Sequence, residues 1–239
     1  MSGPRKRSEQ PLLSICLPVW NEAENVPELV GRLFPALQAA DVPHELVVVD
    51  DDSEDGTAEA FQEYAKDHPI RVIVRKNERG LGSAIHRGLR ESTGEILSVM
   101  DADLSHPPEV MPRLYRAVVE DGYEMAIGSR YVRGGGTVDW GWNWRLNSWG
   151  ASFLARPLIA VRDPMSGFSC FPRFVYDRAD VNPISCKITL EILVKCRPRR
   201  VREIPIIFAN RTRGESKISM RRQIDYLIHL ARLYQRKFL

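Results

Sequence analysis

The sequence lacks the features that mark several special classes of protein. Its four cysteines show no C-x-x-C spacing, which argues against a zinc or disulfide framework and favours buried, reduced thiols. No apolar run approaches the roughly 20 residues that a membrane-spanning helix needs. The polar, basic residues 1–10 precede no apolar core, so we expect no signal peptide. A net charge of +3 is too small to indicate nucleic-acid binding.

What is present is an alternation of strands and helices. The 239 residues, 44% hydrophobic and 27% charged, suit one large domain or at most two. We expect strands over 12–19, 45–49, 70–75 and 95–100, and helices over 25–40, 57–68 and 83–93. Strands that alternate with helices predict a parallel sheet, whose ligand crevice lies beyond the carboxyl ends of the strands.

An apolar run from Ile96 to Met100 ends in Asp101 and Asp103. Residues two apart on extended chain point the same way, so both carboxylates can converge on one point. They repel each other unless a cation lies between them, and hard oxygen ligands suit Mg²⁺ or Mn²⁺. Alone, a D-x-D spacing is weak, because loop acids of this spacing are common.

Two earlier strand ends also carry polar groups. The turn after residue 19 is explained equally well by Asn21 or Asn25 capping a helix. The acids at 50–52 favour a helix N-terminus, yet three successive aspartates need hydrogen-bond donors, which a nucleobase or ribose would supply.

The glycines of the G-L-G segment at 80–82 do not form a dinucleotide fingerprint. The pattern G-x-G-x-x-G needs a third glycine where Ile85 stands. We therefore expect a tight turn that lets the next helix pack closely on the sheet, with His86 facing outward or making a structural hydrogen bond.

Seven short motifs follow one another along the chain. They are P-V-W-N-E at 18–22, V-V-D-D-D-S-E-D-G-T at 48–57, D-A-D-L-S-H-P-P at 101–108, G-S-R-Y at 128–131, W-R-L-N-S-W-G-A at 144–151, D-P-M-S-G-F at 163–168 and R-T-R-G-E-S-K at 211–217. In this order and spacing they resemble the inverting family-2 glycosyltransferases, and within them the polyprenyl-phosphate (dolichol-phosphate) mannosyltransferases. The resemblance runs over nearly the whole chain, from about residue 12 to 233.

The resemblance implies a GT-A fold: an α/β fold with a Rossmann-like, mostly parallel sheet, flanking helices and here a C-terminal amphipathic helix. It implies a nucleotide-sugar donor held through Mg²⁺ or Mn²⁺. The donor-binding residues that it implies are Pro18, Trp20, Glu22, Val49, Asp51, Asp101, Ala102, Asp103, Lys187, Arg211 and Lys217. Trp20 replaces the tyrosine usual there, and either ring can lie against a base or ribose. The implied metal ligands are Asp101, Asp103 and Ser105; because Ser105 stands where many relatives carry a longer glutamine, a water can intervene.

The second half is expected to bind the acceptor. A lipid phosphate arrives already ionised, so it needs cations to position it rather than a strong general base. The implied acceptor-binding residues are Arg130, Arg145 and Ser148, and the implied catalytic set is Asp101, Asp103, Arg130 and Arg211. Glu191 either orients Lys187 as an i,i+4 pair or forms a structural salt bridge.

The leading prediction is transfer of mannose from GDP-mannose to polyprenyl (dolichyl) phosphate with inversion. One alternative keeps the fold and takes UDP-glucose or another NDP-sugar as donor. A second makes the acceptor a saccharide hydroxyl, which the absence of a family-typical base motif disfavours. A third is a non-catalytic nucleotide-sugar-binding module, which the full set of charged residues disfavours.

Membrane contact is expected at the C-terminus. Residues 1–10 are predicted to be a disordered basic tail and 11–239 a single domain, with a donor half at 11–105, an acceptor half at 106–219 and an amphipathic helix at 220–239. The helix lies in the bilayer interface or packs on its own domain. Tryptophans at 140, 142, 144 and 149 form either an interface cluster or a buried one. We expect a protein at the cytoplasmic face of the membrane, held by peripheral contact or by a separate membrane-anchoring subunit.

Overall fold

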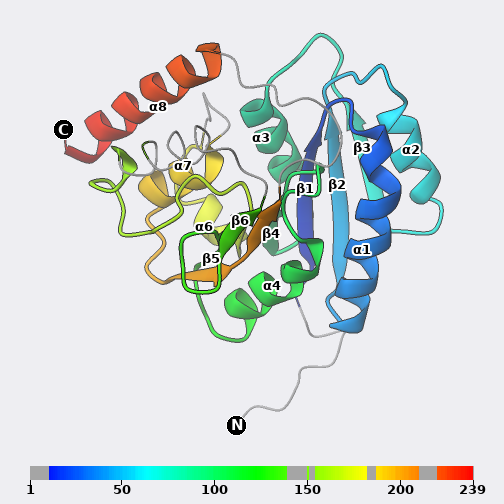
Figure 1. The fold of residues 1–239 in the computed structure, drawn as a ribbon, viewed down its shortest axis with the longest axis horizontal. Coiled ribbons are helices and arrows are strands. Elements are labelled where there is room, and N and C mark those ends of the chain that lie inside the picture. Colours follow the sequence, from blue (N-terminus) through cyan, green and yellow to red (C-terminus); the bar gives the residue numbers. More distant parts are fainter. Residues whose placement is uncertain (1–10, 139–149, 151–153, 182–186, 210–219, 239) are drawn as a thin grey trace.

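The computed structural model describes residues 11–138, 150, 154–181, 187–209 and 220–238, which form a large mixed sheet with helices on both faces (Figure 1). In spatial order the strands of this sheet are β3 (Ile70–Val74), β2 (His44–Asp50), β1 (Leu13–Val19), β4 (Ile96–Val99), β7 (Ser169–Pro172), β5 (Met125–Ser129) and β8 (Val201–Pro205). β7 runs antiparallel to both of its neighbours, and the other neighbours are parallel. A small parallel pair, β6 (Gly136–Val138) and β9 (Ile207–Ala209), lies beside it. The predicted mostly parallel α/β sheet is confirmed.

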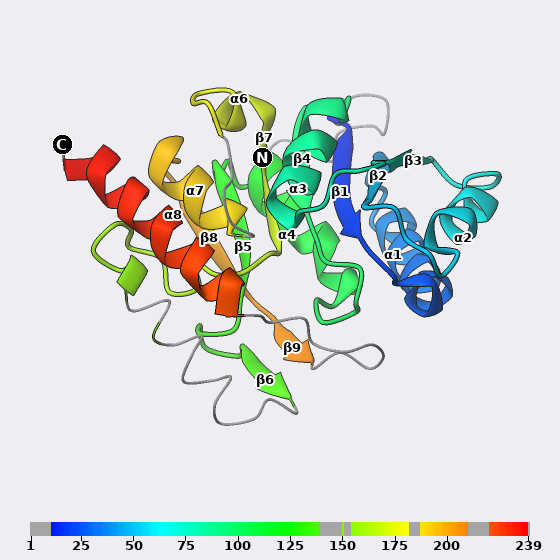
Figure 2. The same ribbon diagram turned by 90° about the horizontal axis from the view of Figure 1, so that it is seen from above.

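Two layers of helices cover the sheet (Figure 2). The helices are α1 (Val26–Ala39), α2 (Thr57–Tyr64), α3 (Leu81–Glu91), α4 (Met111–Val119), α6 (Arg173–Tyr176), α7 (Ile188–Lys195) and α8 (Met220–Phe238). Residues of β1 alternate between the layers, as strand geometry requires. Ile15 belongs to the core shared with α1, α2 and α4, whereas Cys16 belongs to the core shared with α3, α6 and α7. Burial raises the pKa of the Cys16 thiol to about 12, which fits an inert core cysteine.

The seven strands and helices expected in the first hundred residues are all present, with shifted ends. The second helix stops at Tyr64 rather than at His68. Pro69 explains part of this difference, because a proline disfavours helical backbone in the residue before it. Helix α3, which follows the first glycine of the G-L-G segment, packs closely on the sheet at Gly88. A Cβ at Gly88 would lie 2.3 Å from Cys16 Sγ, so the missing side chain lets α3 pack closely on β1.

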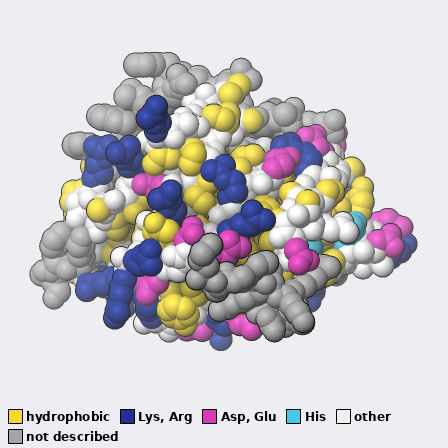
Figure 3. Space-filling view, turned by 90° about the horizontal axis from the view of Figure 1, so that it is seen from below, with side chains coloured by type: hydrophobic (Ala, Val, Ile, Leu, Met, Phe, Trp, Pro, Cys, Tyr) yellow, Lys and Arg dark blue, Asp and Glu magenta, His cyan; other side chains and the backbone are white. Residues whose placement is uncertain are grey.

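The C-terminal helix α8 packs on the outside of α7. Leu230 and Leu233 join a small core with Leu190 and Val194 of α7. Over the part of the chain that the structure describes, no helix is both long enough and apolar enough to cross a membrane. On the face seen in Figure 3, basic side chains lie among acidic and apolar ones without a continuous basic surface. The tail at 1–10 and the tryptophans at 140, 142, 144 and 149 lie outside the described residues.

Candidate active site

The ends of strands β1, β2 and β4 meet at one edge of the sheet. Val19 lies opposite Asp50 in the β1–β2 pair, and Cys16 lies opposite Val99 in the β1–β4 pair. The loops that follow these strands therefore share the edge at which open α/β sheets bind ligands. The predicted site residues at this edge are Pro18, Trp20, Glu22, Val49, Asp51, Asp101, Ala102, Asp103 and Ser105.

Hydrogen bonds join the loops after β1 and β2. The backbone N–H of Asn21 donates to Ser53 Oγ over 2.9 Å, and that of Glu22 donates to Thr57 Oγ1 over 2.9 Å. Ser53 in turn donates from its backbone and its hydroxyl to Asp50 Oδ1. Burial raises the pKa of Asp50, which has no exposed surface. Asn21, a predicted cap, instead accepts the backbone N–H of Glu54 at Oδ1 over 3.1 Å, and neither α1 nor α2 has a side-chain cap hydrogen bond, so the capping prediction is wrong and this polar side chain joins the two loops.

Asp51 is held by a buried arginine that is not among the predicted residues. Arg75 Nε donates to Asp51 Oδ1 over 2.8 Å, and Arg75 Nη2 donates to the same oxygen. The backbone N–H of Gly80 donates to Asp51 Oδ2 over 2.8 Å. Arg75 and Gly80 therefore donate many of the hydrogen bonds to this acidic loop that we expected from a nucleobase or ribose. Arg75 is the last residue of a predicted strand, and nothing in the sequence marks it as the partner of Asp51.

The carboxylates of Asp101 and Asp103 follow β4 in different environments. The Asp101 side chain is 33% exposed, whereas Asp103 is 4% exposed and accepts the backbone N–H of Ser105 over 3.0 Å. Ser105 is itself buried. Among the described residues, no group of three or more His, Cys, Asp or Glu side chains is placed to hold a metal ion. Two hard carboxylates fit a divalent cation only if other oxygens, from a substrate or from water, complete its shell.

His106 connects Asp101 to the second half of the site. Its buried ring accepts the backbone N–H of Asp101 at Nδ1 over 3.3 Å. The ring stacks on Phe168 with centroids 5.1 Å apart and meets the edge of Phe208 at 5.3 Å. Burial lowers the pKa of His106, which favours the neutral ring. Because Nδ1 accepts the Asp101 N–H, the proton of a neutral ring belongs on Nε2. His106 is not among the predicted residues, although it stands inside the D-A-D-L-S-H-P-P motif.

Arg130, a predicted acceptor-binding residue, is buried and paired with Asp163. Arg130 Nε and Nη2 donate to the two carboxylate oxygens over 2.8 and 2.6 Å, and the backbone N–H of Arg130 donates over 2.9 Å. Burial alone would lower the pKa of Arg130, but Asp163 outweighs it and raises the pKa. Asp163 thus holds the Arg130 guanidinium along its Nε–Nη2 edge. The pair connects the G-S-R-Y motif with the D-P-M-S-G-F motif.

Lys187 directly precedes α7, and its Nζ donates to the Met165 carbonyl over 3.4 Å. Glu191 forms a structural ion pair with Lys195, so the salt-bridge alternative for Glu191 is confirmed. His229 Nε2 of α8 lies 3.3 Å from Glu191 Oε2. The other predicted residues, Arg145, Ser148, Arg211 and Lys217, lie outside the described part of the chain.

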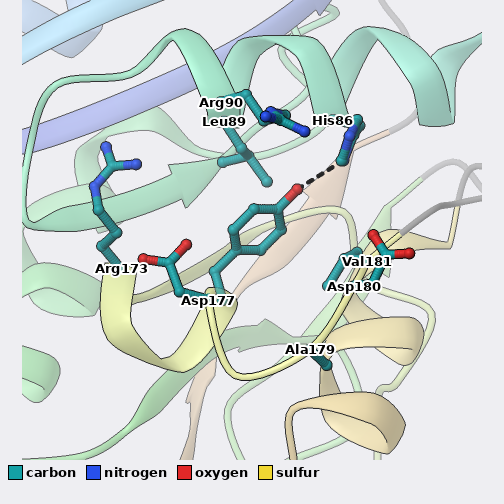
Figure 4. Close-up of a pocket in the computed structure, with 9 residues that line it drawn as sticks. His86, Leu89, Arg90, Arg173, Asp177, Ala179, Asp180 and Val181 are labelled. Carbon is teal, nitrogen blue, oxygen red and sulfur yellow. Dashed lines mark hydrogen bonds between the residues drawn. The ribbon is translucent and has the colours of Figure 1, made fainter.

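A cavity of about 370 Å³ lies between α3 and α6 and contains none of the predicted site residues (Figure 4). His86 and Tyr176 meet in it through a hydrogen bond of 2.8 Å, which confirms the structural role expected for His86. Arg173 in its wall donates to the carbonyls of Ser92 and Gly94, just before β4 begins. The cavity is therefore distinct from the edge at which β4 ends.

Comparison with known proteins agrees with this arrangement. The family model described as Glycosyl transferase family 2 matches residues 14–181. A dolichol-phosphate mannosyltransferase of Saccharomyces cerevisiae is 40% identical over 242 residues, which cover 94% of this chain and 88% of the yeast protein. One of Pyrococcus furiosus is 44% identical over 225 residues, which cover 92% of this chain and 63% of the Pyrococcus protein. This chain thus spans less than two thirds of the length of the Pyrococcus relative.

Solved structures with low sequence identity share the fold. Glucosyl-3-phosphoglycerate synthase from Mycobacterium tuberculosis, in complex with Mn²⁺, UDP-glucose and phosphoglyceric acid, matches with a TM-score of 0.72 at 18% identity, covering 97% of this chain and 81% of that one. The mannosyltransferase PcManGT from Pyrobaculum calidifontis, in complex with GDP-Man and Mn²⁺, matches with a TM-score of 0.65 at 19% identity, covering 95% and 66%. Together with the family model and the relatives, these matches show that the chain has the GT-A fold and belongs to glycosyl transferase family 2, among the dolichol-phosphate mannosyltransferases.

Proposed function

We propose that this protein transfers mannose from GDP-mannose to a polyprenyl phosphate, with inversion at the anomeric carbon. The observation that carries the proposal is the carboxylate pair Asp101 and Asp103 at the sheet edge, in a chain 40% identical to a yeast dolichol-phosphate mannosyltransferase. The nucleoside lies against Trp20 and Asp51, and the diphosphate lies at Asp101 and Asp103. Lys187, Arg211 and Lys217 offset the negative charge of the leaving GDP.

A divalent cation, Mg²⁺ or Mn²⁺, would be held by Asp101 and Asp103, with Ser105 acting through water, and when bound it would offset charge on the diphosphate. Support for a cation comes from the PcManGT and glucosyl-3-phosphoglycerate synthase complexes, both of which contain Mn²⁺. Asp103 fits this role because its buried carboxylate, oriented by the Ser105 N–H at Oδ1, is the hard oxygen ligand that such cations prefer.

The acceptor phosphate is bound by Arg130, Arg145 and Ser148. It attacks the anomeric carbon from the face opposite GDP, and because it is already ionised no side chain has to remove a proton. The Arg130 guanidinium stays charged and fixed by Asp163, so it positions the phosphate without taking a proton from the nucleophile.

The lipid acceptor requires a surface that meets a bilayer, and we assign this role to the outer face of α8. Leu227 and Ile228 are 52% and 43% exposed there, and Arg232 is exposed one turn further on. Leu154, 46% exposed, lies beside the same helix, because Tyr234 donates to its carbonyl over 2.7 Å. Apolar side chains flanked by cations suit an anionic membrane surface.

The membrane face is tested by sedimentation with vesicles of phosphatidylcholine and phosphatidylserine. Replacing both Leu227 and Ile228 by Glu should abolish co-sedimentation, whereas the control Gln235→Glu, on the same helix, should reduce it only slightly. Equal binding of all three proteins would show that another surface contacts the lipid.

The activity is tested with purified protein, Mg²⁺ or Mn²⁺, dolichyl phosphate and a panel of labelled NDP-sugars. Label should enter the lipid phase from GDP-mannose. Label from UDP-glucose alone would overturn the donor assignment. Nucleotide-sugar binding without transfer to any lipid phosphate would instead favour a non-catalytic module.

A further inference from the structure

The side chain of Arg79 lies over the ring of Trp20. Its guanidinium carbon is 5.1 Å from the ring centroid, a cation–π distance. Arg79 is exposed, and within the described ranges of the chain no carboxylate forms an ion pair with it. A cation at the predicted nucleoside site is thus available to a ligand.

The turn that carries Arg79 is fixed by the Asp51–Arg75 pair. Arg75 Nη1 donates to Ser83 Oγ over 3.0 Å, and Arg75 Nη2 donates to the Gly80 carbonyl over 3.2 Å. The N–H of Gly80 returns to Asp51 Oδ2. Arg79 directly precedes Gly80, so its backbone position is set by the same residues that hold Asp51.

Asp51 by itself does not distinguish one base from another. A carboxylate offers about four acceptor positions. Arg75 fills two on Oδ1 and Gly80 fills one on Oδ2, which leaves one for a ligand. A single N–H donor fills that position, and both uracil and guanine present one. Asp51 cannot accept both the N1–H and the N2–H of guanine, one on each oxygen, because Oδ1 already accepts two hydrogen bonds from Arg75.

We propose that Arg79 is the residue that selects guanine in the donor. Guanine presents two neighbouring acceptors, O6 and N7, which match two N–H groups of an arginine fork, whereas uracil has one acceptor on the corresponding edge. The inference rests on the proposed function, which puts the base of GDP-mannose against Trp20. Trp20 supplies the apolar contact, Asp51 accepts one N–H, and Arg79 donates to the neighbouring edge of the base, which carries O6 and N7.

The test is calorimetric binding of GDP, UDP and 7-deaza-GDP, which lacks the N7 acceptor, to the full chain. Arg79→Gln should weaken GDP binding about 10- to 100-fold and leave UDP binding within about 2-fold, since a bidentate contact to guanine gives this order of discrimination. Arg79→Lys keeps the charge without the fork and should not restore the GDP affinity. Wild type should bind 7-deaza-GDP more weakly than GDP, and this difference should vanish in Arg79→Gln.

Arg90→Gln, an exposed arginine at the other end of α3, serves as the matched control and should bind all three nucleotides as wild type does. Equal loss of GDP and UDP affinity in Arg79→Gln, rescued by Arg79→Lys, would show that Arg79 acts only as a charge and would overturn the inference. The inference would also be overturned if both Arg79 variants kept the wild-type preference for GDP over UDP. A wild-type protein that prefers UDP would contradict the proposed donor itself, which is a separate failure.

Discussion

Asp163 receives three hydrogen bonds from Arg130, two from its guanidinium and one from its backbone. The Asp163 side chain has no exposed surface and that of Arg130 is 7% exposed, so the two charges compensate each other away from water. Removing one charge leaves the other buried without its partner, which is costly.

Asp163→Ala should therefore lower the free energy of unfolding by about 3–5 kcal/mol, the usual cost of breaking a buried pair. The double variant Asp163→Ala with Arg130→Ala should be destabilised by less than the sum of the two single variants. Urea unfolding followed by circular dichroism measures both effects. Additive losses would show that the two side chains do not stabilise each other.

Gly167 lets the D-P-M-S-G-F motif approach the Asp101 carboxylate closely. A Cβ at Gly167 would lie 3.2 Å from Asp101 Oδ2 and 3.4 Å from His106 Cε1. Gly167→Ala should therefore displace Asp101 and lower kcat on the order of 10- to 100-fold, as small misplacements of reacting groups do.

The control for this prediction is Gly31→Ala, on the exposed side of α1, where a Cβ would meet nothing within 4 Å. It should keep full activity and gain about 1 kcal/mol of stability from helix propensity. Steady-state transfer of labelled mannose measures kcat for both variants. Wild-type kcat in Gly167→Ala would show that Asp101 does not depend on this close approach.

The stability of the packing of α8 on α7 depends on pH, because Glu191 of α7 contacts Lys195 and, in α8, His229. Burial by itself raises the pKa of Glu191, but hydrogen bonds from His229 and Lys195 outweigh it and the pKa is lowered from 4.5. A carboxyl with a lowered folded-state pKa gives stability that is fully present above pH 4.5 and is lost as the pH falls through the lowered value. Glu191→Gln should thus reduce Tm at pH 7, and its difference from wild type should shrink below pH 4.5.

Glu63→Gln is the matched control, because Glu63 lies in α2 and its ion pair with Lys66, in the turn that follows, is largely exposed. Such surface pairs contribute little, so its Tm should follow wild type at every pH. A Tm difference between Glu191→Gln and wild type that stays constant from pH 7 to pH 3 would contradict the role of the Glu191 charge.

Much of the fold and one side of the site follow from local patterns. Apolar runs followed by acids locate the ends of β2 and β4, and parallel pairing then brings Asp51 and Asp101 to one edge. Arg75, His106 and Asp163 carry no such signal, because each is defined by a contact to a side chain whose position depends on the whole fold. The antiparallel β7 could not be predicted for the same reason: its four residues, Ser169–Pro172, form a strand by pairing with two other strands, β4 and β5.

In the proposed function, Asp103 supports metal-dependent transfer of mannose to a lipid phosphate. The measurement that tests it is the release of labelled mannose from GDP-mannose into the lipid phase, by wild type and by Asp103→Asn, with Mn²⁺ and with EDTA. We predict rapid transfer by wild type with Mn²⁺, none with EDTA, and none by Asp103→Asn, whose circular dichroism should match that of wild type. Transfer by wild type that persists in EDTA, or undiminished transfer by Asp103→Asn, would contradict the account.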